Sequence, residues 1–165
     1  MAISFVVAIT LSMIPFIAIV SIIVFLIHAK YNIISGILLF TIIAFVGFMI
    51  YPQLFVIWYG DIYYTIGGIS ALILTFKNLK PDQLPIKTGL KVGIIGAGIS
   101  SFLISIYQWF FYTILNSFDI IILGINFAYF TPFALILGSI IGYIYGYIKK
   151  KQEEDGEQEL SLIDM

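Results

Sequence analysis

Cysteine and arginine are missing from this sequence, and histidine occurs only once, at His28. The lack of cysteine excludes disulfide bonds, a thiolate nucleophile and any metal site that needs sulfur ligands. A zinc site of the usual kind needs several histidine, cysteine or carboxylate ligands, and one histidine cannot supply them. We therefore predict no metal and no cofactor.

Charged side chains are also scarce. They make up 10% of the 165 residues, whereas hydrophobic residues make up 61% and the mean hydropathy is +1.10. A soluble domain of this length has about a quarter charged residues, which keep its surface solvated. The composition therefore predicts an all-α integral membrane protein in the cell membrane, with the lipid bilayer as its surroundings and no nucleic-acid partner.

Five apolar segments are candidates for transmembrane helices, each of which needs about 20 apolar residues. They cover residues 2–27, 33–58, 62–76, 89–115 and 120–148. We expect one compact bundle in which the first segment is a permanent span, because its apolar run is too long for a removable signal. The polar loop "KNLKPDQLPIKTG" contains Pro81 and Pro85, which we expect to stop any helix.

The third segment is short, so it must either begin earlier, within "WYGDIYY", or enter and leave the membrane on one side. The lysines favour the first alternative. With five crossings, all eight lysines fall on one side, and Asp61 and Asp119 fall on the other. This is the distribution that the positive-inside rule predicts, with the N-terminus outside and the C-terminus in the cytoplasm.

Small residues recur at every fourth position in the last two segments. On a helix this spacing forms one stripe, and facing stripes let two helices approach closely in a bilayer. We predict that the two stripes pack against each other within the chain; the alternative is that one contacts another subunit or a second copy. The stripes consist of Gly89, Gly93, Ala97, Ser101 and Ser105, and of Gly138, Gly142 and Gly146.

The stretch "GAGISS" partly matches G-x-G-x-x-G, the fingerprint of dinucleotide-binding proteins. Ser101 stands where the third glycine belongs, and the preceding "PIKTGLK" is a basic loop rather than a buried strand. We interpret the match as accidental, and the glycines as helix-packing positions.

Few polar groups fall within the apolar segments. Asp61 is the best candidate for a functional polar residue, although a simple place in the outer loop is the favoured interpretation; Asn126 is the second candidate. A catalytic triad would need His28 together with Asp61 or Asp119, which the predicted topology places on opposite faces of the membrane. We therefore predict no catalytic residue and no enzymatic activity.

The cytoplasmic face carries seven lysines that we expect to contact anionic lipid head groups. They are Lys77, Lys80, Lys87, Lys91, Lys149, Lys150 and Lys151. The tail, residues 149–165, is short and strongly charged, and its composition predicts disorder.

These features predict a small polytopic membrane protein that acts as a non-catalytic subunit or scaffold of a membrane complex. Its small-residue helix faces would bind other membrane subunits or a second copy. The alternative is a small oligomeric transporter or channel, supported by Pro15 and Pro132 within the apolar segments. A lipid-modifying enzyme is a third hypothesis, and it would require Asp61 or His28.

Overall fold

The computed structural model describes residues 18–28, 30–50, 57–116 and 120–163, which form helices joined by short connections. No strand occurs within these ranges, so the prediction of an all-α fold is confirmed for them. A helix over Ala18–Ile27 is followed by α2 (Asn32–Ile50), α3 (Ile57–Lys77), α4 (Pro85–Asn116) and α5 (Ile120–Ile163).

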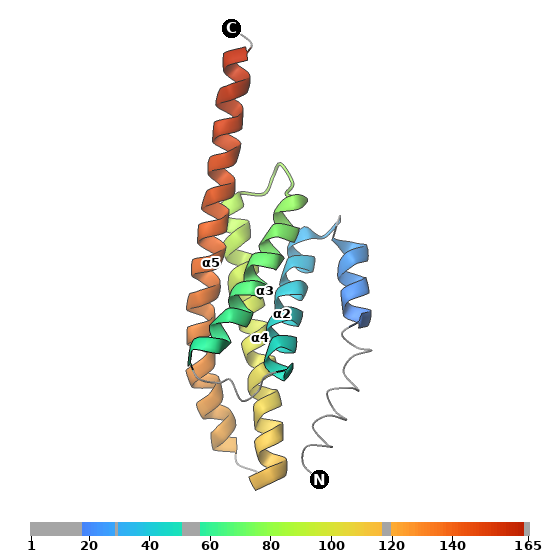
Figure 1. Cartoon of the computed structure of the whole chain (residues 1–165), viewed down its shortest axis with the longest axis vertical. Helices are drawn as coiled ribbons and strands as arrows, with labels where there is room; N and C mark the ends of the chain where they lie inside the picture. Colours follow the sequence, from blue (N-terminus) through green and yellow to red (C-terminus); the bar gives the residue numbers. More distant parts are fainter. Residues whose placement is uncertain (1–17, 29, 51–56, 117–119, 164–165) are drawn as a thin grey trace.

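The four long helices form a bundle in which successive helices run in opposite directions (Figure 1). α4 and α5 share the most extensive contact, α2 packs against α3 and α4, and α3 also contacts α5. No Cα atom of α2 comes within 8 Å of one of α5, so these two helices meet only through side chains such as Phe40 and Ile141. α3 and α4 therefore lie in the middle of the bundle, and the opening of α4 meets the closing turns of α3 and the apolar part of α5.

The predicted end of the second segment is wrong. We expected a helix over residues 33–58, but α2 ends at Ile50, and Ile57 already belongs to α3. The sequence contains Pro52 two residues after α2, and proline lacks the amide hydrogen that a helix interior needs and disfavours helical backbone in the residue before it. The connection, residues 51–56, lies outside the described part.

The third predicted segment, residues 62–76, is longer than expected. α3 spans 21 residues from Ile57, which at 1.5 Å per residue gives about 32 Å. It therefore includes the whole of "WYGDIYY", in agreement with the first of the two alternatives, in which the segment begins earlier. The backbone of Asp61 lies in this helix, so the favoured interpretation of Asp61 as a loop residue is wrong.

The fourth and fifth segments are also longer than predicted. Pro85 begins α4 instead of stopping a helix, because the first turn does not need its amide hydrogen and its fixed φ suits a helix start. α5 does not end near residue 148 but continues through the tail to Ile163, and Figure 1 shows it projecting beyond the bundle.

The helical tail differs from the disorder that we predicted for residues 149–165. Lysine, glutamine and glutamate are good helix formers, and a helix that is already nucleated extends at little cost. Two ion pairs at i, i+4 spacing support it, with Lys149 Nζ 3.8 Å from Glu153 and Lys150 Nζ 3.2 Å from Glu154. Residues 164–165 lie outside the described part.

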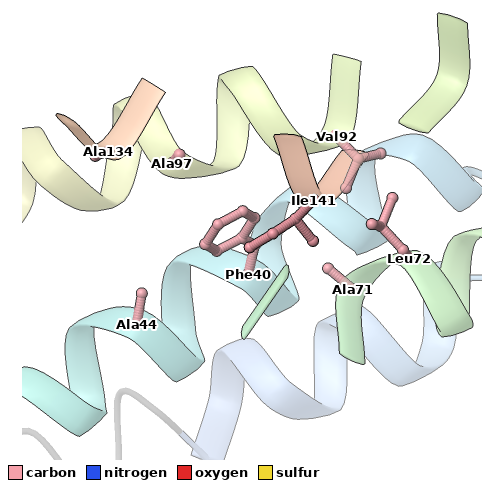
Figure 2. Packing of buried hydrophobic residues seen from close by; sticks show 8 residues of the cluster. All are labelled: Phe40, Ala44, Ala71, Leu72, Val92, Ala97, Ala134 and Ile141. Atoms are coloured by element: carbon pink, nitrogen blue, oxygen red, sulfur yellow. The ribbon is translucent and has the colours of Figure 1, made fainter. Parts of the chain in front are cut away.

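The core is centred on Phe40 of α2, whose side chain is fully buried. Figure 2 shows its ring among Ala71, Val92 and Ile141, from three other helices. Glycines make room for it, since a Cβ at Gly96 would lie 2.7 Å from the ring. The core therefore combines one large aromatic ring with aliphatic side chains and with small residues that make room for it.

Two segments of the described chain are long and apolar enough to cross a membrane, Pro85–Tyr107 and Leu123–Gly156. Three other helical stretches are apolar but shorter: Ala18–Ile27, Asn32–Phe48 and Ile62–Lys77. The alternating directions of the helices agree with the predicted threading. Five complete crossings remain a prediction.

Candidate functional site

The contact between α4 and α5 is built from the glycines that the sequence singled out. A Cβ added at Gly93 would overlap the carbonyl oxygen of Gly138, and one added at Gly89 would overlap that of Gly142. The reverse also holds, because Cβ atoms at Gly138 and Gly142 would overlap the carbonyl oxygens of Gly93 and Gly89. The two backbones therefore touch, which is the approach that only glycine allows.

The rest of the two stripes follows the same antiparallel order. Gly146 lies against the first turn of α4, with its Cβ position 2.8 Å from the Pro85 carbonyl oxygen. At the other end, the hydroxyl of Ser101 lies 3.4 Å from that of Thr131. Ala97 packs against Gly138, whereas Ser105 is buried and donates a hydrogen bond to Ser101 O at 2.9 Å within α4. The small-residue stripes of α4 and α5 therefore pack against each other within one chain.

A second close contact joins α2 to α3, and our sequence analysis missed it. Gly36 lies against the hydroxyl of Thr75, and its Cβ position is 3.2 Å from the Ala71 carbonyl oxygen. The signal was present, since Gly67, Ala71 and Thr75 recur at every fourth position, as in the stripes of α4 and α5.

A buried amide pair fixes the turn between α3 and α4 to the start of α2. Asn32 Nδ2 donates to Gln83 Oε1 at 2.6 Å, and Gln83 Nε2 donates back to Asn32 Oδ1 at 3.2 Å. Asn32 also donates to the carbonyl oxygen of Thr75 at 3.3 Å, and Gln83 Oε1 accepts the backbone amide of Lys80 at 3.2 Å. Asn32 is 2% exposed, whereas Gln83 is partly exposed, so the pair lies at the edge of the buried interior. No sequence pattern indicated this pair, whose members are 51 residues apart.

The lysines gather at one end of the bundle, where α3 ends, α4 begins and α5 leaves it (Figure 1). They differ in their partners. Lys149 and Lys150 pair with Glu153 and Glu154, and Lys30 lies 5.3 Å from the centre of the Tyr31 ring. Five others are exposed and form no ion pair with any described residue: Lys77, Lys80, Lys87, Lys91 and Lys151.

The remaining polar candidates are Asp61, Asn126 and His28. Asp61 and Asn126 lie in α3 and α5, but their side chains are outside the described part of the structure. His28 donates from Nδ1 to the carbonyl oxygen of Phe25 at 2.5 Å and stacks on its ring. Within the described ranges, no three histidine or carboxylate side chains lie close enough together to hold a metal ion.

The outer surface of the bundle carries large apolar side chains. They lie along α3, α4 and α5, and on the helix Ala18–Ile27, where Phe25 is 73% exposed. The interior instead contains glycine, alanine, serine and threonine as well as a few larger residues. Examples of the exposed set are Ile94, Ile99 and Phe102 on α4, and Ile125, Ile136 and Ile140 on α5.

No protein-family model matches this chain, and no curated protein and no solved structure is significantly similar to it.

Proposed function

We propose that the chain is a multi-pass integral protein of the cell membrane that serves as a non-catalytic subunit or scaffold of a membrane complex. The observation that carries this proposal is the distribution of side-chain size. Small residues are frequent in the interior, and many isoleucine and phenylalanine side chains face outward, as with buried Gly93 and exposed Ile94.

In water, a bundle with so many exposed apolar side chains would be unfavourable. Exposed apolar area costs about 25 cal/mol per Å², and contiguous patches of more than a few hundred Å² are rare on soluble monomers. In a bilayer the same side chains are solvated by lipid tails, and helices associate through close packing of small residues. The size distribution therefore favours hydrocarbon as the medium around α3, α4 and α5.

The polar groups of the interior support a structural rather than a catalytic role. Buried hydroxyls donate to carbonyl oxygens of their own helix, which uses the one O–H proton that each could offer to a substrate. Ser35 donates to Asn32 O at 3.0 Å, Thr75 to Ala71 O at 2.7 Å, and Ser100 to Gly96 O at 2.8 Å. Because the stripes of α4 and α5 pack against each other, they are not accessible to another protein. We therefore expect partner subunits to contact the large apolar side chains on the outer surface of the bundle.

The transporter alternative draws on one observation. Pro132 lies inside α5 and is exposed, so the carbonyl of Ala128 lacks the amide donor that a regular helix would provide. Such breaks form binding sites in some transporters, although local repair is the usual outcome.

Single-cysteine labelling tests the membrane proposal, and the cysteine-free chain is well suited to it. Lys80→Cys and Gln152→Cys should react with an impermeant maleimide from the cytoplasmic side, and Ile120→Cys from the outside. The protein should also stay in the membrane pellet at alkaline pH. Release into the supernatant, or labelling of positions 80 and 152 from opposite sides, would refute the proposal.

Two further measurements test the role as a subunit. Purification of the full chain from its native membrane in mild detergent should recover a stoichiometric membrane partner. Liposomes that contain the purified chain alone should show no flux of ions or small solutes. Flux that disappears in Asn126→Ala would instead support the transporter.

A further inference from the structure

The structure divides the lysines at the cytoplasmic end into two groups that the sequence does not distinguish. On α5, Lys149, Lys150 and Lys151 are followed one turn later by three acidic residues, and two of the lysines form ion pairs with them. The net charge of this short stretch is therefore close to zero.

The second group surrounds the turn between α3 and α4, and we call it the turn lysines. It comprises Lys77, Lys80, Lys87 and Lys91, all exposed and without an ion pair among the described residues. Between Lys77 and Lys91 the only acidic residue is Asp82, so this stretch carries an excess of positive charge.

The turn lysines lie on a fixed backbone. The amide pair of Asn32 and Gln83 holds the turn against α2, and Gln83 also accepts the amide of Lys80. Lys87 and Lys91 are one turn apart on α4 and both are exposed, so they lie on the same side of that helix. A fixed backbone lowers the entropy lost when a ligand is bound.

The apolar surface begins where the turn lysines end. Ile94 and Ile95 of α4 are exposed within one turn after Lys91. A bilayer that covers these isoleucines would place its phosphate groups at the depth of the turn. The adjacency of exposed hydrocarbon and unpaired ammonium groups matches an anionic phospholipid, whose charged head group is joined directly to hydrocarbon chains.

We infer that the turn lysines bind the head groups of anionic phospholipids, and that the α5 lysines mainly stabilise their own helix. This inference rests on the proposed membrane location. It predicts an unequal effect of removing the same charge from two places at one end of the molecule.

The test uses the full chain in phosphatidylcholine bilayers that contain spin-labelled phosphatidylglycerol or spin-labelled phosphatidylcholine. The ratio of their association constants at the protein surface measures the anionic preference. Lys80→Gln with Lys87→Gln should lower this ratio at least fivefold toward one, at roughly fivefold per fully engaged lysine. Lys149→Gln with Lys150→Gln, a matched change of two charges, should lower it less than about twofold.

Equal losses in the two double variants, or a ratio of one in the unsubstituted chain, would overturn the inference. Failure of the membrane proposal looks different. A chain outside the bilayer would immobilise neither lipid, whereas an embedded chain without a head-group site would immobilise both equally. Circular dichroism of both variants checks that the helices are intact.

Discussion

Gly93 on α4 and Gly138 on α5 each occupy the space that a side chain on the other would need. The carbonyl oxygen of each lies at the Cβ position of its partner. Since backbone atoms are in contact, no rotamer change can relieve an added methyl group, and the two helices would have to separate.

Gly93→Ala should therefore destabilise the bundle by about 1–3 kcal/mol, the usual range for overpacking. Gly124→Ala is the matched control on α5, because nothing lies within 4 Å of its Cβ position. Alanine is the better helix former, so this control should be neutral or stabilising by up to about 1 kcal/mol. Thermal unfolding in detergent measures both. Equal stability of the two variants would contradict the close packing of α4 and α5.

Phe40→Ala should be among the most damaging single substitutions in the described part. The ring is fully buried beside Gly96, and its loss would leave a cavity costing about 3–5 kcal/mol. Phe133→Ala removes the same atoms from a side chain that is 46% exposed, and should cost under about 1 kcal/mol. Chemical denaturation of the two variants gives the comparison, and a smaller effect at position 40 than at position 133 would disprove the central role of this ring.

Asn32 and Gln83 should behave as a coupled pair. Asn32→Ala or Gln83→Ala alone leaves one amide without its partner, at a cost of about 1–3 kcal/mol. The double variant should cost less than the sum of the two, with a coupling of about 0.5–3 kcal/mol in a double-mutant cycle. Asp82→Ala, an exposed change in the same turn, should leave the stability within about 0.5 kcal/mol. Additive effects at positions 32 and 83 would argue against the pair.

The extension of α5 beyond the bundle should be detectable by hydrogen exchange. Amides of residues 149–156 should exchange more slowly than in an unfolded peptide, and Gly156→Ala should increase their protection by about 0.5–1 kcal/mol. Glu154→Gln removes the pair with Lys150 and should decrease it by a few tenths of a kcal/mol at low salt. Exchange at the unprotected rate would restore the prediction of disorder.

At two of the wrongly predicted helix ends, the adjoining helix matters more than the local composition does. The composition of residues 149–163, taken without the rest of the chain, is too polar for a stable helix and therefore predicts disorder. They are helical because the bundle has already nucleated α5. Pro85 was interpreted as a stop because proline ends helices that precede it, yet here the helix follows it.

The sequence by itself determined the helical class, the scarcity of chemistry-bearing side chains and the stripes of small residues, because each depends on composition or on a spacing of a few positions. Tertiary structure alone decided that Gly93 meets Gly138 instead of a second copy, that Asn32 finds Gln83, and that some lysines are paired while the turn lysines are not. These are contacts between distant parts of the chain. A periodic pattern predicts which face of a helix is suited to close packing. Only the folded bundle determines which other helix that face contacts.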